Sequence, residues 1–395
     1  MRNAETSSGK PDPNLAVTYS SSADPSVRQV IETLQPFKAL SPEARVVIKP
    51  NIVLSRKRWL GANTRPEIVE SLVVLLREQG VRNITIADGS GIGESATRAF
   101  KICGYTEIAD KHGVRLVDID RDRFIERSTL TDGPFSKLAL SQTVADCDYL
   151  INVPVIKAHC QTRVTCSLKN LKGVMPRQLK SSFHGADLER AIAQLAALVT
   201  PDFVLADGTY GDLSSELGGK PVNLGIIAGG RDPLTVDCFA ASTLGFSPAA
   251  IAHIAHYARA RGVDPAAFQP VLHELNHPSG DRVFETDTDG FRAYPCTVQL
   301  GNTCCTCHGN LRFALERMRE ARVLSGEDHY YIGSFGTAAE AAGEKRAQQH
   351  CRAHRAIAVG DCARAAVSPP AEIAVPGCPP SADAIVRAVR NAKAV

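Results

Sequence analysis

The sequence predicts an α/β protein with a mainly parallel sheet and flanking helices, followed by a smaller C-terminal α/β unit. Short apolar, β-branched runs alternate with segments of helical periodicity, and several of these runs end in polar, loop-forming residues. Cysteines are concentrated in the last quarter of the chain. Alternating strands and helices favour a parallel sheet covered on both faces, with functional sites at the carboxyl ends of its strands.

The larger unit is predicted to begin with a βαβ arrangement. An apolar run at residues 45–48 is followed by helical periodicity over 65–79 and by a second apolar run at 83–87. Periods of about 3.6 residues indicate helices, and short β-branched runs indicate strands. The same signals predict further strands at 114–117, 149–155, 203–206 and 224–228, a helix at 188–198, and a helix that follows the last of these strands and runs through Phe239.

Composition divides the chain into three parts. Residues 1–25 are polar and rich in Ser and Pro, which predicts a disordered lead-in. Residues 26–285 are predicted to form the substrate-binding α/β domain, and a stretch rich in Pro, Gly and Asp separates it from residues 286–395. In the last part we expect strands at 329–333, 356–359 and 372–375, and helices at 310–322, 344–354 and 381–392.

Charge and hydropathy argue against several classes of partner. Lys plus Arg number 45 and Asp plus Glu 42, a net charge of +3 that gives no reason to expect nucleic acid. The amino-terminal residues lack the apolar core of a signal peptide, and no apolar run reaches the roughly 18 residues that span a bilayer. We therefore expect a cytoplasmic protein without a membrane partner.

Cysteines stand at three predicted element ends of the smaller unit. Residues 302–308 precede a helix, whereas Gly360-Asp-Cys362 and Pro376-Gly-Cys378 each follow a strand. If these strands are parallel neighbours, the three segments meet at one edge of the sheet and four thiolates converge, as an iron–sulfur cubane requires. Glycines before Cys362 and Cys378 let the backbone approach closely, and the prolines after Cys378 stiffen the loop.

Two other interpretations of these cysteines stay open. Structural zinc sites usually show two paired knuckles, whereas here two of the cysteines stand singly in different loops. An isolated cysteine is more often a small buried hydrophobe, and we interpret Cys103, Cys147, Cys238 and Cys351 in this way.

The order of the cysteine motifs resembles the proximal-cluster domain of hydrogenase small subunits. The shared features are C-x2-C, then Gly-x-Cys-Ala, then Val-Pro-Gly-Cys-Pro-Pro before a helix. The resemblance implies that a 4Fe-4S cluster is held by Cys304, Cys307, Cys362 and Cys378. The related quinone-oxidoreductase subunit has a tandem Cys-Cys, which would make Cys305 a ligand in place of Cys304 or Cys307.

The densest polar stretch of the larger unit is residues 155–173, which follow a buried strand. Lys157 and His159 lie two residues apart on the strand exit and are expected to project to one side. Lys169 and Lys172 lie three apart on a predicted short helix and share a face. This arrangement suits an anion.

Five segments resemble the domain-of-unknown-function family 362. They are Val47-Ile-Lys-Pro-Asn51, Arg65-Pro-Glu67, Ala87-Asp-Gly-Ser-Gly91, residues 155–173 with their Lys-x-His and Leu-Lys-Asn-x-x-Gly core, and Ala206-Asp-Gly-Thr209. The resemblance covers about residues 45–245. A fainter likeness joins Asn63-Thr-Arg-Pro-Glu67 to the nickel-pincer lactate racemases, although Asn63 replaces the histidine of that motif.

These observations together predict an iron–sulfur oxidoreductase. The cluster would transfer electrons to a small anionic or carbonyl-bearing substrate, with a ferredoxin or flavodoxin as electron donor. His159, Lys157 and Lys169 are the expected catalytic residues, with His159 exchanging a proton because imidazole ordinarily titrates near pH 6.5. The expected substrate-binding residues are Lys49, Asn51, Asp88, Asn170, Lys172 and Asp207.

Two alternative functions stay open. The protein could instead be an electron-transfer module, with the basic residues forming a docking patch for a partner enzyme. It could also be a non-redox lyase, which would need an iron with an open coordination site.

Overall fold

The structure is a computed structural model that divides into two compact units, Met1–Thr286 and Asp287–Val395. It describes residues 14–55, 61–91, 94–159, 162–214, 221–278, 283–286, 291, 294–301, 303, 305–333, 355–366 and 371–393. In these ranges no helix has the length and hydrophobicity needed to cross a lipid bilayer.

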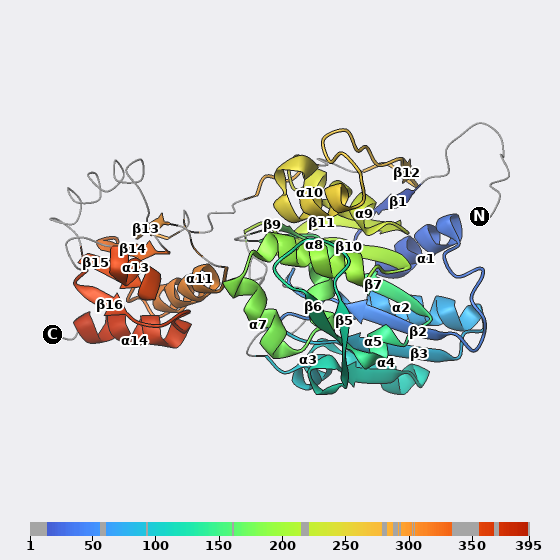
Figure 1. The fold of residues 1–395 in the computed structure, drawn as a ribbon, viewed down its shortest axis with the longest axis horizontal. Helices are drawn as coiled ribbons and strands as arrows, with labels where there is room; N and C mark the ends of the chain where they lie inside the picture. Colours follow the sequence, from blue (N-terminus) through green and yellow to red (C-terminus); the bar gives the residue numbers. More distant parts are fainter. Residues whose placement is uncertain are drawn as a thin grey trace. The chain divides into compact units, whose positions relative to one another are not determined.

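An eight-stranded sheet forms the centre of the larger unit (Figure 1), in the order β12-β1-β11-β10-β7-β2-β3-β4. Its strands are β1 (Leu15–Tyr19), β2 (Arg45–Pro50), β3 (Asn83–Asp88), β4 (Arg115–Asp118), β7 (Tyr149–Val153), β10 (Phe203–Asp212), β11 (Pro221–Gly230) and β12 (Leu272–Glu274). Strand β11 pairs antiparallel with β1 and β10, and the other neighbouring strands pair parallel. The predicted mainly parallel sheet is confirmed.

Helices flank this sheet. They are α1 (Ala23–Leu34), α2 (Pro66–Glu78), α3 (Ala96–Cys103), α4 (Tyr105–His112), α5 (Gln142–Ala145), α6 (Ser167–Asn170), α7 (Arg177–Gly185), α8 (Leu188–Leu198), α9 (Pro233–Thr243) and α10 (Ala252–Ala260). Helix α2 illustrates why they form: it has Pro66 at its first position and buries Ile68, Leu72 and Leu76, four residues apart on one face. Helices α1 to α4 share one apolar core with the sheet, whereas α6, α8, α9 and α10 pack on one another.

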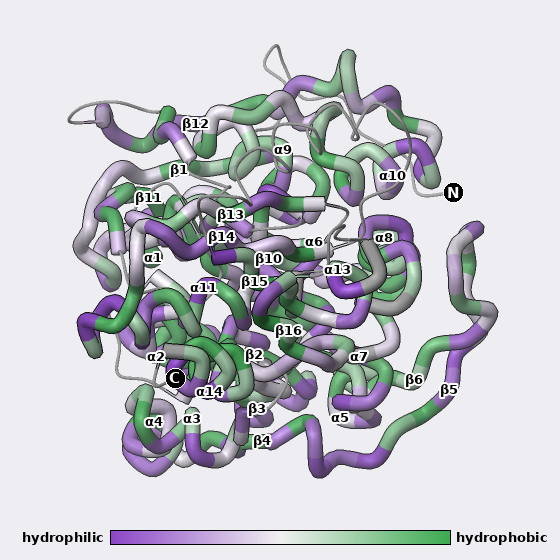
Figure 2. The backbone as a smooth tube through the Cα atoms, turned by 90° about the vertical axis from the view of Figure 1, so that its left-hand side faces the viewer, coloured by the Kyte–Doolittle hydropathy of each residue, from purple (hydrophilic) through white to green (hydrophobic). Residues whose placement is uncertain are grey.

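Three short 3₁₀ helices and two hairpins complete the larger unit. The 3₁₀ helices are η1 (Ile119–Arg121), η2 (Leu171–Val174) and η3 (Pro248–Ala250), and the hairpin strands are β5 (Phe124–Ser128), β6 (Lys137–Ser141), β8 (Lys157–His159) and β9 (Arg163–Thr165). Hydrophilic stretches mark the peripheral β5–β6 hairpin in Figure 2. Its loop is anchored by Phe135, whose ring stacks on Phe183 of α7 with the centroids 5.0 Å apart.

The smaller unit contains a four-stranded parallel sheet in the order β13-β14-β15-β16. Its elements are β13 (Thr297–Leu300), α11 (Cys305–Glu320), β14 (Asp328–Ile332), β15 (Arg355–Val359), α13 (Asp361–Ala366), β16 (Ile373–Val375) and α14 (Ala382–Lys393). Leu311 and Leu315 of α11 and Ile385 of α14 pack into the same apolar core as Ile357 of β15. Because all four strands are parallel, the residues that follow them lie at one edge of this sheet.

The predicted elements agree with the structure in most places and differ in several. Strand β10 continues beyond the predicted end at 206 to Asp212, and helix α9 continues beyond the predicted end at Phe239 to Thr243. Helix α8 has the predicted bounds, but residues 15–25 are not a disordered lead-in, because Leu15–Tyr19 pairs with β11 and β12 and α1 starts at Ala23. Strand β7 ends at Val153, two residues early, because β8 turns away into its own hairpin. Helix α11 begins at Cys305, five residues before the predicted start. The helix predicted at 344–354 lies outside the described residues.

Candidate functional site

A buried ion pair occupies the carboxyl edge of the large sheet. Lys49, near the end of β2, places its Nζ 2.7 Å from Oδ1 of Asp88 at the end of β3, and the two side chains are 0% and 2% exposed. The other Asp88 oxygen accepts the backbone N–H of Ile52 at 2.8 Å. Burial lowers the pKa of Lys49 and raises the pKa of Asp88, while the attraction between the two opposes both shifts.

Asn170 at the end of α6 joins this ion pair to the 155–173 segment. Its side-chain oxygen accepts from Lys49 Nζ at 3.3 Å, and its amide nitrogen donates to Oδ1 of Asn152 at 2.8 Å. Lys49 also donates to the carbonyl of Pro50 at 3.2 Å, so its three N–H donors all have acceptors. The predicted binding residues Lys49, Asp88 and Asn170 therefore form one hydrogen-bonded network.

Lys157 and His159 lie on strand β8 and are buried. The Lys157 Nζ donates to the carbonyl of Ala62 at 2.5 Å. The Nδ1 of His159 accepts the backbone N–H of Thr162 at 3.1 Å, which places the proton of the neutral ring on Nε2. His159 can therefore donate a proton from Nε2.

Three of the other predicted binding or catalytic residues lie on separate elements, Lys169 on α6, Lys172 on η2 and Asp207 on β10. Lys169 and Lys172 are half-buried, with Lys169 donating to the Thr165 hydroxyl at 3.3 Å and the Lys172 Nζ lying 5.7 Å from the centroid of the Phe183 ring. Asp207, which is 1% exposed, accepts from the backbone of Arg65 at 2.9 Å and from the Thr209 hydroxyl at 2.7 Å. Burial raises the pKa of Asp207.

Asn51 follows β2 directly, and its backbone N–H donates to the Thr64 hydroxyl at 2.8 Å. Its side-chain oxygen is buried and has no hydrogen-bond partner in the described part of the chain. A buried polar atom of this kind is rare in native proteins. It marks the end of β2 as a place where a further polar group is expected.

A second cationic group, which the sequence analysis missed, lies on α7. The Lys180 Nζ is 3.0 Å from Oδ1 of Asp120 and 3.2 Å from the carbonyl of Ser90, and Arg177 binds the other Asp120 oxygen at 3.0 Å. The charge of Lys180 acts on both Lys49 and Asp88, so the two cationic groups are close. No strand-end pattern precedes Lys180, which is why the sequence did not reveal it.

A buried acid–imidazole–acid arrangement supports the start of α6. Asp237 accepts the backbone N–H of Ser167 at 2.6 Å and that of Leu168 at 3.2 Å. His253 lies between Asp237, 4.0 Å from Nε2, and Glu189, 2.8 Å from Nδ1. Burial raises the pKa of Asp237 to about 6, and His253 opposes this shift. These groups hold the helix that carries Lys169 and Asn170.

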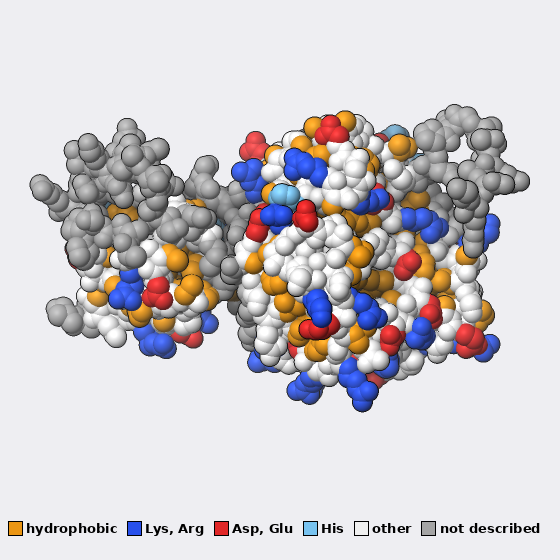
Figure 3. Space-filling model, viewed as in Figure 1, with side chains coloured by type: hydrophobic (Ala, Val, Ile, Leu, Met, Phe, Trp, Pro, Cys, Tyr) orange, Lys and Arg blue, Asp and Glu red, His pale blue; other side chains and the backbone are white. Residues whose placement is uncertain are grey.

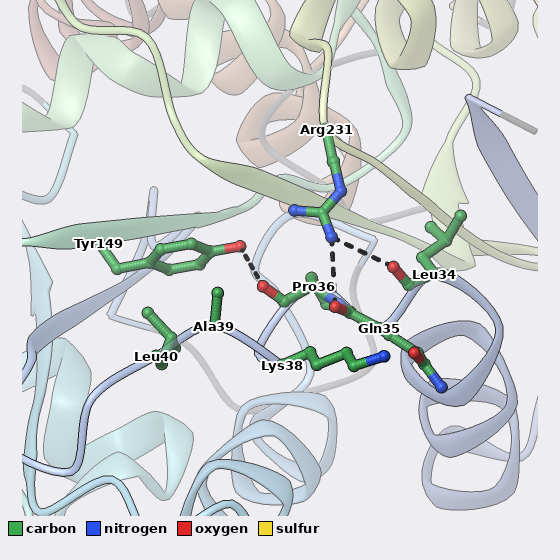
Figure 4. A pocket seen from close by; sticks show the side chains of 8 residues that line it. All are labelled: Leu34, Gln35, Pro36, Lys38, Ala39, Leu40, Tyr149 and Arg231. Carbon is green, nitrogen blue, oxygen red and sulfur yellow. Dashed lines mark hydrogen bonds between the residues drawn. The ribbon is translucent and has the colours of Figure 1, made fainter. Parts of the chain in front are cut away.

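A cavity of about 500 Å³ lies near the amino end of β7, on the opposite edge of the sheet from these groups (Figure 4). The loop between Leu34 and Leu40 lines it together with Tyr149 and Arg231. Tyr149 donates to the Pro36 carbonyl at 3.0 Å, and Arg231 donates to two carbonyls of the same loop, at 3.2 Å each. These donors hold the loop, and none of the predicted site residues lines this cavity.

The cysteine-bearing segments of the smaller unit meet at one edge of its sheet. The N–H of Asp361 donates to the Gly377 carbonyl at 3.1 Å, and that of Gly377 donates to the Asp361 side chain at 3.1 Å. Asn310 of α11 donates to the Pro380 carbonyl at 2.8 Å. The segments that contain Cys307, Cys362 and Cys378 are therefore tied to one another.

Gly360 lies next to the cysteine-bearing segments at this edge of the sheet. A Cβ added to Gly360 would lie 3.8 Å from the Cys307 Sγ and 3.5 Å from the Gly377 carbonyl, so Gly360 lies beside that sulfur and a methyl group there would be in ordinary contact with it. Gly360 and Gly377 have φ angles of +89° and +127°, which favour glycine. Cysteines on three segments at one edge are the type of donor that an iron–sulfur cluster requires.

Part of the predicted ligand set lies outside what the structure describes. Cys304 is outside the described residues, as is the side chain of Cys305. Among the side chains that are described, no three Cys, His, Asp or Glu residues are grouped as metal ligands. Cys307 is 9% exposed, whereas Cys362 and Cys378 are exposed at the surface of the smaller unit.

On the visible face of the larger unit, acidic and basic side chains are interspersed (Figure 3). The cations Lys49, Lys157 and Lys180 are buried instead. The positive charge at the carboxyl edge is therefore an internal feature of the fold, which suits a small ligand better than an extended polyanion.

The comparisons with known proteins concern mainly the larger unit. A thylakoid-associated protein of Synechocystis sp. is 28% identical over 261 residues, which are 64% of this chain and 79% of that protein. The structure of the lactate racemase apoprotein from Thermoanaerobacterium thermosaccharolyticum covers 56% of each chain with 13% identity and a TM-score of 0.34, too low to support an argument. The model of the family described as "Domain of unknown function (DUF362)" matches residues 46–242, which include every predicted binding and catalytic residue of the larger unit. Through residues 46–242, this chain belongs to the DUF362 family.

Proposed function

We propose that this protein is an iron–sulfur oxidoreductase. In this proposal the smaller unit holds a 4Fe-4S cluster through Cys304, Cys307, Cys362 and Cys378, with Cys305 as the alternative to Cys304 or Cys307. The cluster supplies single electrons when bound. The larger unit holds a small anionic or carbonyl-bearing substrate at the carboxyl edge of its sheet.

One observation carries the cluster assignment: three cysteine-bearing segments far apart in sequence are hydrogen-bonded together at one edge of a parallel sheet. The contacts that support it are Asp361 to Gly377 and Asn310 to Pro380. Gly360 lies beside the Cys307 sulfur and has no side chain that would compete with a bound group there. A zinc knuckle does not need ligands from three separate segments.

The substrate role of the larger unit is supported by its buried cations. Lys49, Lys157 and Lys180 are each less than 5% exposed, and a buried cation attracts an anion strongly because water screens it little. The saturated hydrogen bonds of Lys49 suit a role in organising the site, with Lys169 and Lys172 nearer to solvent. In this proposal His159 donates a proton from Nε2 to the reduced substrate.

The proposed redox chemistry also implies an electron donor and a cellular compartment. A ferredoxin or flavodoxin is the proposed electron donor, and a reducing, cytoplasmic compartment would keep the cysteines available as thiolates. The Synechocystis relative is named as thylakoid-associated, and that name applies to the relative.

The test is reduction and reoxidation under anaerobic conditions. Full-length protein is reduced with dithionite, freed of excess reductant, and mixed with small carboxylates and carbonyl compounds while the visible absorbance is recorded. The proposal predicts that at least one compound reoxidises the protein and is itself reduced, and that a His159→Gln variant slows this reaction. Reoxidation only by a protein partner would favour the electron-transfer alternative.

A further inference from the structure

The hydroxyl group of Ser90 is buried, and no described residue binds it. Ser90 lies two residues after the end of β3 and is 1% exposed, and its Oγ has no hydrogen-bond partner in the described ranges of the chain. Buried hydroxyl groups nearly always find a partner, because leaving one unsatisfied costs roughly 1–3 kcal/mol. A further hydrogen-bonding group, which no described residue supplies, is therefore expected at Ser90.

Lys180 presents a donor at the same place. Its Nζ binds the carbonyl of Ser90 at 3.2 Å and the Asp120 side chain at 3.0 Å, and its side chain is 5% exposed. A lysine ammonium has three N–H donors, and these two acceptors are the ones found for it among the described residues. One N–H of Lys180 and the hydroxyl of Ser90 thus remain available beside each other.

The backbone approaches these donors closely. A Cβ on Gly89 would overlap the Lys180 Nζ and would lie 2.9 Å from the Gly173 carbonyl. A Cβ on Gly173 would lie 2.6 Å from the Lys49 Nζ and would overlap the Asp88 carboxylate. Two glycines therefore allow the Lys49–Asp88 pair and Lys180 to share one small region at the ends of β2 and β3.

The charges in this region indicate the charge of the missing group. In the two ion-pair groups described above, the cations are Lys49, Lys180 and Arg177 and the anions are Asp88 and Asp120, which leaves 3 − 2 = 1 positive charge within these groups. A monoanion would neutralise it. The side chain of Arg177, which binds the other oxygen of Asp120, is 41% exposed.

We propose that Ser90 and Lys180 bind one oxygen of a small monoanionic carboxylate at the carboxyl ends of β2 and β3. This inference rests on the proposed function in one respect, namely that the substrate lies at this edge of the larger unit. It adds two binding residues and narrows the substrate class from small anions and carbonyl compounds to carboxylates. The Asn51 side-chain oxygen, buried without a described partner at the neighbouring strand end, suits a hydroxyl group on the same ligand.

The test measures carboxylate binding to full-length protein by calorimetry, with acetate, lactate and pyruvate as probes. Acetamide is the neutral control, and inorganic phosphate tests the preference for a monoanion. The key variant is Ser90→Ala, matched by Ser182→Ala, since Ser182 is an exposed serine on α7 whose hydroxyl binds the Gln178 carbonyl. Lys180→Met is matched by Lys101→Met, a change at an exposed lysine of α3.

We expect a carboxylate to bind the unaltered protein and acetamide not to bind. Ser90→Ala should weaken the carboxylate about 10- to 100-fold, the effect of losing a hydrogen bond to a charged group. The unliganded Ser90→Ala protein should be at least as stable as the unaltered one, because the buried hydroxyl is gone. Lys180→Met should weaken carboxylate binding more than Ser90→Ala does. The control variants Ser182→Ala and Lys101→Met should bind the carboxylate like the unaltered protein.

Three results would overturn the inference. The first is equal carboxylate binding by the Ser90→Ala and Ser182→Ala variants, which is expected if only a water molecule lies at Ser90. The second is tighter binding of phosphate than of any carboxylate. The third is no carboxylate binding at all. Iron analysis of the same samples separates the two proposals. Protein that contains a cluster but binds no carboxylate contradicts this inference alone, whereas carboxylate binding by protein that never acquires iron contradicts the redox function alone.

Discussion

The Nζ of Lys49 lies 2.7 Å from the Oδ1 of Asp88, and water is excluded from both side chains. This ion pair connects the ends of two neighbouring parallel strands at the edge where the other candidate residues gather. A buried pair of this kind adds little net stability, but removing one partner leaves an uncompensated charge. The pair is therefore sensitive to single substitutions.

Lys49→Met should lower the free energy of unfolding by about 3–5 kcal/mol, because it leaves Asp88 buried without its partner. Adding Asp88→Leu should recover part of this loss. Urea unfolding followed by circular dichroism measures both. The control is Arg45→Met, which breaks the exposed pair of Arg45 with Asp148 and should cost much less. Equal losses for Lys49→Met and Arg45→Met would show that the buried pair is not the sensitive one.

Gly173→Ala should separate Lys49 from Asp88, since the added methyl group would lie 2.6 Å from the Lys49 Nζ. We expect a loss of about 1–3 kcal/mol, typical of overpacking. Gly326→Ala is the control, because its nearest neighbour would be the Pro295 carbonyl at an ordinary 3.5 Å. A Gly173→Ala protein as stable as the Gly326→Ala protein would contradict the close approach.

Asp237 should make stability depend on pH. Burial raises its pKa from 3.8 to about 6, so the folded protein retains a proton that the unfolded chain releases between these values. The contribution of Asp237 to the free energy of unfolding therefore falls as the pH rises from about 4 to 6, by on the order of 3 kcal/mol, and is constant above that pH. Asp237→Asn removes this contribution.

The measurement for Asp237 is urea unfolding of both proteins between pH 4 and 7. The stability of the unaltered protein relative to the variant should decrease with rising pH up to about 6. A difference that stays constant or increases would contradict the assignment. Because His253 and Glu189 face the same region, His253→Gln should change the midpoint of this dependence.

Gly360→Ala should reduce the iron content of the purified protein. The substitution places a methyl group 3.8 Å from the Cys307 sulfur, at a residue whose φ of +89° already disfavours alanine by about 1–2 kcal/mol. Gly113→Ala is the matched control, because Gly113 also has a positive φ, +59°, but its added Cβ would meet nothing within 4 Å. Equal iron content in the two variants would argue against a cluster beside Gly360.

The strand-end residues were predictable from the sequence because each follows a short apolar run directly. Lys49 and Asp88 meet as expected, since parallel strands end at one edge of the sheet, and Asn170 reaches them from the end of α6. Strand β1 was not predictable, because Leu15–Tyr19 lies in a polar stretch and pairs with β11, which is about 200 residues away in sequence.

The role of α7 was also hidden in the sequence. Lys180 stands in a helix with no strand before it, so only the fold brings it to Ser90 and Asp120. Helix α11 begins at Cys305 although its apolar positions begin at Leu311, which is why periodicity placed its start too late. The position of Lys180 and the start of α11 both depend on tertiary packing, which the local sequence pattern does not show.

The most direct test of the central claim is analysis of iron and acid-labile sulfide in protein purified without oxygen, with EPR spectra before and after dithionite. We predict about four irons and four sulfides per chain and a 4Fe-4S signal that appears on reduction. Cys362→Ser should lose most of this iron, whereas Cys147→Ser, a change in the larger unit, should keep it. A colourless protein that contains zinc or no metal would contradict the account.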